Sequence, residues 1–331
     1  MLGGGMTFVV VVALGLGITG ASAAPTARHL EAPGCEGVTV NAPPPGGDQL
    51  SVTDAGMAGA SPLLEKANAA HVKWATNVSC TAVGKRDHRS KPAPLHSPKT
   101  TTSPSSTLGS STNWSGYDTD ASTAYYAQME WYQPTVSNPS GASDSYSCIW
   151  PGIGGENGGV LVQAGTEADR HSYLPGQTDY FWYEVVTSNS SVQTRVNGVS
   201  VTAGDDVGAA VSYNQSAGTV SFTVVNFTAG TSANFSVATP HPSGTAEWIV
   251  ERTEINGNLT FPYLANFGTA RVIAAYYNIQ GNGAARTPQQ GGAQPITMYS
   301  QRAGSAVLSS PNPLGANNAP QFTVTWHSPG I

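Results

Sequence analysis

Lysine is absent from residue 113 to the end of this 331-residue chain. That stretch contains six arginines and fourteen acidic residues, a formal charge of 6 − 14 = −8, whereas residues 1–112 contain eight basic and six acidic residues, 8 − 6 = +2. A strongly acidic domain argues against binding to nucleic acid. In acid, carboxylates become neutral while lysines stay charged, so a domain without lysine accumulates less positive self-repulsion. A genome that favours arginine over lysine codons would produce the same absence.

Cysteine is scarce as well. The three cysteines show no CxxC or Cys/His spacing, which argues against a zinc site, and we predict neither a metal nor another cofactor. Cys35 and Cys80 can pair if the chain is secreted. Cys148 then has no partner, and its apolar neighbours predict a buried free thiol.

Long hydrophobic runs are missing except near the start. Residues 8–18 are apolar but too few for a comfortable membrane span, and Ala21-Ser22-Ala23 follows them as a small-residue cleavage site. No lysine or arginine precedes the run. We interpret residues 1–23 as a signal peptide, which predicts a secreted, extracellular protein without a membrane anchor after cleavage.

Standard hydrolase signatures are also absent. The chain has no GxSxG, HExxH, DTG, DSG or SxxK motif, and His171, His241 and His327 occupy loop-like or terminal positions. A Ser-His-Asp triad is defined by geometry, but nothing in the sequence points to one. If the protein is an enzyme, carboxylates and amides are its available catalytic groups.

The first third of the chain reads as a propeptide. Little periodicity precedes a predicted helix, which begins with Ser61 as N-cap and Pro62 at N1 and runs to about Ala75. A Ser/Thr/Pro-rich linker ends the region at residue 112. We predict that residues 24–112 are detachable, which explains the linker, the charge asymmetry and a basic cluster together. That cluster consists of Lys85, Arg86, Arg89 and Lys91. A surface run, a processing site or a patch that docks on the acidic C-terminal domain would each account for it.

From residue 113 onward, short β-type runs alternate with turns of Gly, Asn, Ser and Pro. Neither a helix nor an internal repeat is evident. We predict that residues 113–331 form one all-β domain, an antiparallel sandwich or barrel. The predicted strands are 124–132, 145–150, 159–164, 179–187, 208–213, 219–226, 233–237, 247–252, 270–278, 296–300 and 321–326.

Three of these strands carry acidic or amide side chains on one face, because strand side chains alternate between faces. A single polar residue on a half-buried strand most often faces solvent. Three such strands strengthen the alternative, the wall of an acidic groove, but they do not decide between the two. The residues that share a face are Gln163 and Glu167 if that strand persists, Trp182 and Glu184, and Glu247 and Glu251.

Five segments resemble the eqolisins in order and approximate spacing. The eqolisins are glutamic peptidases, known best from acid-secreting fungi, with bacterial members. The segments are NWSG at 113–116, WPGIGG at 150–155, LVQAG at 161–165, WYE at 182–184 and AEWIVE at 246–251. The resemblance covers roughly residues 113–327. It implies a two-sheet, concanavalin A-like sandwich, a removable inhibitory propeptide and acid endopeptidase activity on polypeptides.

By motif, the catalytic Gln and Glu of the family correspond to Gln163 and Glu251. The resemblance implies that Glu251 takes a proton from the attacking water and passes it to the departing amine. A glutamate of ordinary pKa, about 4.3, suits that role in acid. An amide such as that of Gln163 does not titrate, so it can donate to the oxyanion at low pH.

Other site residues also carry over by motif. Trp114, Trp150 and Trp182 match groove-lining positions, although a sandwich core would suit them equally. Glu167 and Glu184 match supporting acids, and we interpret Glu247 as a neighbour of the catalytic acid. The chain departs from the fungal pattern where Gly154 replaces an Asp, and Glu167 stands where an Asp is usual. These differences affect the subsites or the acid network and leave the dyad intact.

Two other functions fit part of the pattern. Concanavalin A-like sandwiches often bind sugars, and exposed tryptophans can stack on them. A glycosidase would need a pair of carboxylates roughly 5–9.5 Å apart. Glu247 and Glu251 lie about 13 Å apart by strand rise, so another partner such as Glu184 would be required. We expect a monomeric peptidase and rank both the sugar-binding module and the glycosidase below it.

Overall fold

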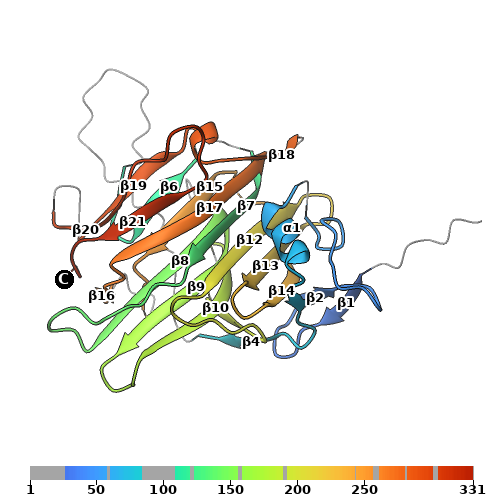
Figure 1. Cartoon of the computed structure of the whole chain (residues 1–331), viewed down its shortest axis with the longest axis horizontal. Helices are drawn as coiled ribbons and strands as arrows, with labels where there is room; N and C mark the ends of the chain where they lie inside the picture. Colours follow the sequence, from blue (N-terminus) through green and yellow to red (C-terminus); the bar gives the residue numbers. More distant parts are fainter. Residues whose placement is uncertain are drawn as a thin grey trace, which may run out of the picture.

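Two antiparallel sheets face each other across one apolar core in this computed structural model (Figure 1). The structure describes residues 27–57, 60–83, 109–119, 123–155, 159–188, 192–242, 244–255, 261–279, 282–300 and 305–330. The predicted signal peptide, the basic cluster and most of the predicted linker lie outside these residues. None of the helices in the described part of the chain has the length and apolarity needed to cross a membrane.

Sheet B carries the polar strands of the sequence analysis. Its strands follow one another in space as β19 (Gln294–Tyr299), β6 (Trp114–Asp118), β15 (Ala246–Glu251), β8 (Asp144–Gly154), β9 (Leu161–His171), β10 (Gln177–Val186), β11 (Thr194–Asn197) and β4 (Ser79–Ala82).

Sheet A lies opposite. Its order is β1 (Arg28–Glu31), β2 (Val38–Ala42), β14 (Thr231–Ala238), β13 (Thr219–Asn226), β12 (Asp206–Asn214), β7 (Ala124–Tyr132), β17 (Thr269–Ile279), β21 (Phe322–Trp326), β20 (Val307–Pro311) and β19. β19 pairs with both sheets and therefore bridges one side of the sandwich. Short strands flank these: β3 (Lys73–Trp74) beside β14, β5 (Ser110–Ser111) beside β19, β16 (Tyr263–Leu264) beside β8, and β18 (Asn282–Arg286) beside β17.

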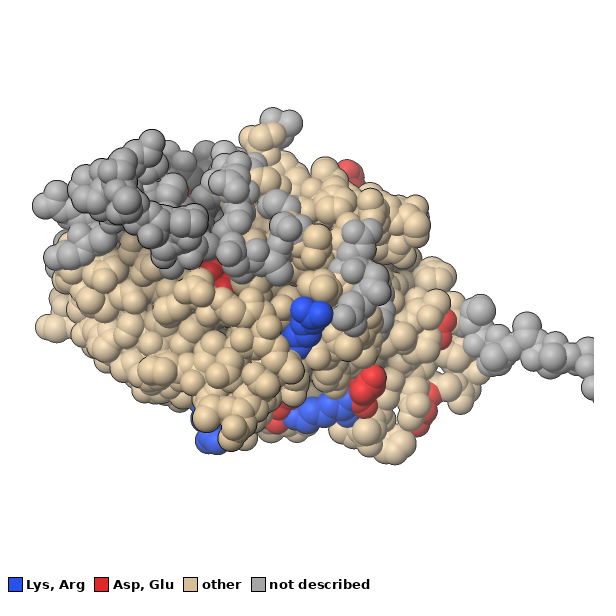
Figure 2. Space-filling view, turned by 90° about the horizontal axis from the view of Figure 1, so that it is seen from above, with Lys and Arg blue, Asp and Glu red and all other residues tan. Residues whose placement is uncertain are grey.

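The core between the sheets follows from alternation along the strands. Residues such as Val162, Phe181 and Trp248 of sheet B meet Trp131 and Phe222 of sheet A there, all of them fully buried. Burial of such large apolar side chains is the main favourable term in folding. The face shown in Figure 2 carries few charged side chains, in keeping with a composition of 10% charged residues.

The prediction of an antiparallel sandwich is confirmed, and every predicted strand overlaps an observed one. β7 and β13 match their predictions at both ends. The strands that the sequence analysis missed are short, and one of them, β6, contains Gly116, whose φ of 151° is unusual for other residues. Among the described residues after Asn113, the only helix is a 3₁₀ turn, η2 (Gln289–Gly291).

The predicted helix is shorter than expected. α1 spans Pro62–Ala69, with Ser61 as its N-cap accepting a hydrogen bond from the Leu64 N–H. The prediction that it runs to about Ala75 is wrong, because His71 adopts a left-handed conformation, with φ of 52°. The chain then forms β3, which pairs with β14. Trp74 therefore lies on a strand, where its side chain is buried.

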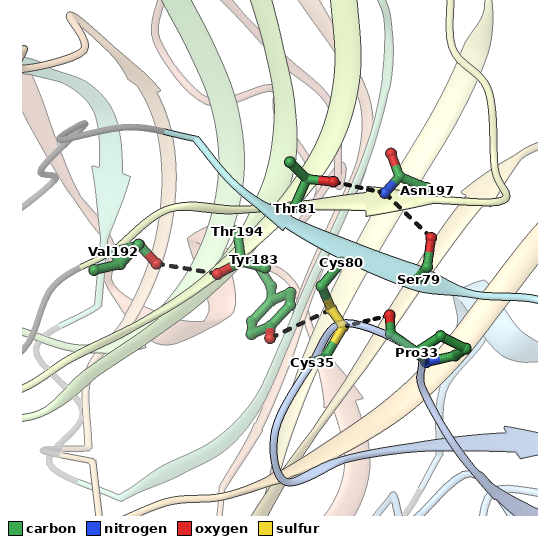
Figure 3. The surroundings of a disulfide bond; sticks show 9 residues. All are labelled: Pro33, Cys35, Ser79, Cys80, Thr81, Tyr183, Val192, Thr194 and Asn197. Atoms are coloured by element: carbon green, nitrogen blue, oxygen red, sulfur yellow. Dashed lines mark hydrogen bonds between the residues drawn. A yellow bond between two sulfur atoms is a disulfide. The ribbon is translucent and has the colours of Figure 1, made fainter.

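The residues before the helix were expected to show little regular structure, yet they form β1 and β2. We call residues 27–57 and 60–83 the N-terminal segment. Its strands extend both sheets: β2 adjoins β14 in sheet A, and β4 adjoins β11 in sheet B. A disulfide joins Cys35 to Cys80 within this segment, as secretion would allow (Figure 3). Cys148 is free and buried, as predicted.

Two buried carboxyl groups make the stability of the fold depend on pH. Burial raises the pKa of Glu130 on β7, although Lys66 of α1 donates a hydrogen bond to it at 2.6 Å. Burial also raises the pKa of Asp179 on β10, although the amides of Gln133 and Gln177 donate to it. Each group therefore binds its proton more tightly in the folded than in the unfolded chain.

We accordingly expect the protein to be more stable near pH 4 than at pH 7. The contribution of a raised carboxyl pKa is fully present below the ordinary values, 4.5 for Glu130 and 3.8 for Asp179, and is lost as pH rises through the folded values. Urea midpoints at the two pH values measure the difference. The double variant Glu130→Gln/Asp179→Asn should narrow this difference in urea midpoint, whereas Glu36→Gln, at an exposed carboxylate, should not. An unchanged difference in the double variant would contradict this assignment.

Candidate active site

The register of sheet B arranges side chains in three rows on its outer face, the face turned away from sheet A. Cross-strand partners share a face, so each row can be read directly from the pairing. The Glu251 row contains Trp114, Glu251, Cys148, Glu167 and Tyr180. The middle row contains Gly116, Ile249, Trp150, Gly165 and Trp182. The Gln163 row contains Asp118, Glu247, Gly152, Gln163 and Glu184.

All eight residues that the sequence analysis singled out for the site lie in these rows. β9 continues to His171, which satisfies the condition for Gln163 and Glu167 to share a face. The three tryptophans pack in a cluster of their own on this outer face, separate from the core between the sheets. The three tryptophans thus lie outside the core between the sheets, and their groove-lining role stays a prediction. The site residues are Trp114, Trp150, Gln163, Glu167, Trp182, Glu184, Glu247 and Glu251, each at most 2% exposed.

The Glu251 carboxylate is held by neutral donors. The Trp150 indole Nε1–H donates to Oε2 at 2.7 Å, and the Asn113 amide donates to Oε1 at 2.9 Å. The Cys148 thiol lies 3.8 Å from Oε2. Asn113 is itself fixed, because its carbonyl accepts the Arg252 N–H and its side chain accepts from the Ser111 hydroxyl. The carboxylate therefore has a defined orientation inside a site that excludes bulk water.

Gln163 is oriented by a different acid. Its amide Nε2 donates to Glu184 Oε2 at 2.9 Å, across the β9–β10 ladder. Its buried Oε1 has no hydrogen-bond partner within the described part of the chain. A buried polar atom without a partner is costly, so this oxygen is available to a ligand or water that reaches it. The amide thus retains one N–H and one oxygen for further contacts.

The Trp150 indole lies on β8, the strand between Gln163 and Glu251. On β8 the partner of Glu251 is Cys148 and the partner of Gln163 is Gly152. Gln163 and Glu251 are therefore two strands apart and offset by four residues along the strands. Glycines make room for the indole: a Cβ on Gly152 would lie 2.7 Å from Cζ3 of Trp150, and one on Gly165 would lie 2.7 Å from its Cβ. The Trp114 ring meets the Trp150 ring edge-on, with centroids 5.0 Å apart.

Glu167 anchors a second hydrogen-bonded group. Its Oε1 accepts from the Thr253 hydroxyl at 2.6 Å, and its Oε2 accepts from the Gln193 amide at 2.7 Å. Thr253 follows Glu251 by two residues, so this group connects the end of β15 to β9. Neither Thr253 nor Gln193 was predicted from the sequence as a site residue, and Asn113 was identified only as part of a motif. A hydroxyl or amide in a loop carries no local signal of a partner far away in the chain.

Cys148 stands between the two acids, as the cross-strand partner of both Glu251 and Glu167. Burial raises the pKa of its thiol well above the ordinary value, and the charges of Glu167 and Glu251 raise it further. The thiol therefore stays neutral and is a poor nucleophile.

The remaining two positions are Glu247 and Gly154. Glu247 lies in the Gln163 row, two rows from Glu251, and accepts a short hydrogen bond from the Thr245 hydroxyl. Gly154, at the end of β8, pairs with Leu161 and has a φ of 98°, a conformation that favours glycine. The acid of the fungal pattern would be strained at this position.

Comparison with known proteins decides the family. The model of the Peptidase A4 family matches residues 112–318. The chain belongs to the Peptidase A4 family. As a Peptidase A4 member it is a glutamic peptidase, and the resemblance to the eqolisins is confirmed.

Solved structures support the fold of this Peptidase A4 member. Two structures of scytalido-glutamic peptidase, one with a transition-state analogue inhibitor and one with a peptide-based analogue, are each 18% identical to it. Each comparison covers 65% of this chain and 98% of the other, with TM-scores of 0.54 and 0.51. At this identity the likeness shows a common fold. The comparison with curated proteins gives no match.

Removing the indole N–H from Glu251 should impair catalysis more than folding. In Trp150→Phe, a buried carboxylate loses one donor, and a hydrogen bond to a charged group is worth about 1.5–3 kcal/mol. We expect kcat/KM for a peptide substrate in acid to fall about 10–100-fold. Trp248→Phe is the matched control, because that indole is equally buried and donates at 2.8 Å to the Gln128 carbonyl in the core. It should lower the melting temperature with little effect on kcat/KM, and equal losses of kcat/KM in the two variants would contradict the assignment.

Proposed function

We propose that the protein is an acid endopeptidase in which Glu251 is the general base and then the general acid, and Gln163 stabilises the tetrahedral intermediate. The observation that carries the proposal is the Glu251 carboxylate, buried and held by Trp150 and Asn113 on the same sheet face as Gln163. The carboxyl group of Glu184 accepts a hydrogen bond from the Gln163 amide, and that of Glu167 accepts one from Thr253, just after β15.

The reaction uses these groups in two steps. Water attacks the carbonyl carbon of the substrate while Glu251 accepts a proton from that water. The tetrahedral intermediate carries a negative oxygen, and the free N–H of the Gln163 amide donates to it. Glu251 then transfers its proton to the departing amine, the C–N bond breaks, and the carboxylate is regenerated.

Glu184 has a positioning role in this scheme. Because its carboxylate accepts one N–H of Gln163, the amide cannot exchange its N–H and C=O ends without losing that bond. The orientation keeps the second N–H available for the oxyanion. A preorganised donor of this kind need not reorient during the reaction, which is why such donors contribute strongly to catalysis.

We further propose that the chain is secreted as a zymogen and that its N-terminal region acts as an intramolecular inhibitor. Complete burial of the site residues supports this, because a polypeptide substrate cannot reach a side chain that is fully covered. The charge division supports it as well, since a basic cluster attracts an acidic groove. Acid would weaken that attraction as the groove carboxylates become protonated.

The alternative functions have less support. In the register Glu247 and Glu251 lie two rows apart, and Glu184 is engaged by Gln163, so no pair of these acids is set up for a glycosidase. A carbohydrate-binding module would not need the Glu251 carboxylate and the Gln163 amide oriented by specific donors and acceptors. Binding to a glycan array without proteolysis would favour it.

Digestion of a denatured protein substrate tests the mechanism. Wild type should cleave at acidic pH and much less at neutral pH, and Glu251→Gln should lose at least about 1,000-fold in kcat, because the general base and acid is removed. Glu247→Gln is the control on the same strand and face, and it should retain most activity. Equal activity of Glu251→Gln and wild type would overturn the mechanism, and equal losses in the two variants would overturn the choice of Glu251.

Neutralising the basic cluster tests the zymogen model. Replacing Lys85, Arg86, Arg89 and Lys91 with glutamine should speed the appearance of active peptidase at mildly acidic pH, because less charge attraction remains to be overcome. The control replaces Lys73, an exposed residue of β3, with glutamine. An activation rate that does not change on neutralising the four residues would count against this model.

A further inference from the structure

The two long sides of the sandwich are completed differently. β19 bridges the sheets on one side, whereas the N-terminal segment covers the edge strands β14 and β11 on the other. β2 pairs with β14 over residues 234–237, β3 pairs with it at residues 231–232, and β4 pairs with β11 over residues 194–197. Uncovered, both strands would expose rows of backbone groups that promote aggregation.

Apolar contacts fasten α1 to the outer face of sheet A. Leu63, Leu64 and Ala67 are fully buried in a cluster that includes Tyr126 and Val225 of the sheet. The sheet is shaped to receive the helix at one point. A Cβ on Gly208 would lie 2.5 Å from Leu63 Cδ1 and 3.1 Å from the Met129 carbonyl oxygen.

The polar contacts of the N-terminal segment are mostly neutral. The Ser61 and Tyr126 hydroxyls are hydrogen-bonded at 2.8 Å, and the Leu63 N–H donates to Gln128 at 2.9 Å. Asn41 donates to Asn234 at 2.6 Å within the β2–β14 ladder. None of these groups titrates in acid. Among the described residues of this contact surface, the ion pairs are those of Lys66 with Glu130 and Asp206, so most of the attachment does not depend on pH.

The disulfide strengthens the segment without tying it to the rest of the chain. It joins the β1–β2 turn at Cys35 to β4 at Cys80, with Cα atoms 5.3 Å apart, and thus connects the additions to the two sheets (Figure 3). The Tyr183 hydroxyl of β10 lies 3.7 Å from the Cys80 sulfur. Both cysteines belong to the N-terminal segment, so this link cannot hold the segment to residues 109–330 once the backbone is cut.

The end of the segment also touches the candidate site. The Val83 N–H donates to the Gln193 carbonyl at 3.0 Å, and the Gln193 side chain donates to Glu167. The Val83 side chain packs against the tryptophan cluster of the outer face. Val83, which directly follows β4, therefore helps to position Gln193, and Gln193 in turn holds the carboxyl group of Glu167.

We propose that residues 27–83 are a permanent part of the peptidase, bound to both sheets without a covalent link after the chain is cut between residues 84 and 108. The proposal changes the zymogen model of the preceding subsection in one respect. Residues 27–83 remain in the active enzyme, so inhibition falls to the part of the N-terminal region that contains the basic cluster. The proposal rests on the proposed function in one point only, namely that the complex of the two pieces is the active peptidase.

The test uses the full chain with a recognition sequence for a site-specific protease in place of residues 100–105. The Glu251→Gln background prevents self-digestion. After cleavage, size-exclusion chromatography and native mass spectrometry at pH 7 and pH 4 should show both pieces as a one-to-one complex. A folded C-terminal piece that elutes alone at pH 4 would overturn the proposal, and neither result depends on proteolytic activity.

A pair of variants on α1 tests the contact surface. Leu63→Asp in the cleaved protein should weaken the association at least about 100-fold, because it places a charge in a fully apolar site. Glu65→Ala, on the exposed face of the same helix, should change it less than about 2-fold. If Leu63→Asp prevents folding of the full chain, the cleaved protein with Leu63 intact still shows whether the two pieces stay associated. Equal effects of the two variants would argue against the α1 contact surface.

Activity assays of fractions from the protein with Glu251 intact separate the two proposals. Activity that travels with the complex supports a permanent segment. Full activity in fractions that lack residues 27–83 overturns it. If no fraction is active, the proposed function fails, while the elution of the two pieces still decides whether the segment stays bound.

Discussion

The antiparallel register between β15, β8 and β9 is the constraint on which the site depends. It sets Glu251 opposite Cys148 and Cys148 opposite Glu167, and it sets Gly152 opposite both Glu247 and Gln163. A shift of one residue in either ladder would send these side chains into the core between the sheets. The large apolar residues at alternate positions, such as Trp248, prevent that shift because they must stay buried. The core thereby specifies the geometry of the polar face.

Within the described part of the chain, two acids of the outer face accept hydrogen bonds from donors that carry no charge. Trp150, Asn113, Gln193 and Thr253 are all neutral, and they contact the carboxyl groups of Glu251 and Glu167. A lysine or arginine in these places would hold the acids ionised, and the pairing would be lost as the acids became protonated. Neutral donors and an amide keep the same arrangement over a wider range of acidic pH. This explains physically why a domain without lysine suits the work proposed for it.

Alternation and motif spacing predicted the strands and the face of each acid, because both are local properties. AEWIVE alone placed Glu247, Ile249 and Glu251 on one face, and the structure adds the cross-strand partners of each. The partners of Glu251 could not be predicted in this way. Asn113 lies 138 residues from it, and only the β6–β15 pairing brings the two together. The end of α1 was misjudged because pairing of β3 with β14 overrides the local helix pattern.

The pairing of β2 with β14 has a consequence for the order of events during synthesis. Asn41 meets Asn234 across 193 residues of sequence, so β2 leaves the ribosome long before its partner exists. Contacts this far apart in sequence form slowly, and they follow the closure of long loops. β2 can pair early with β1, but its edge facing β14 is among the last to be paired and stays unprotected until then. Its covalent attachment keeps the local concentration of that strand high until β14 arrives.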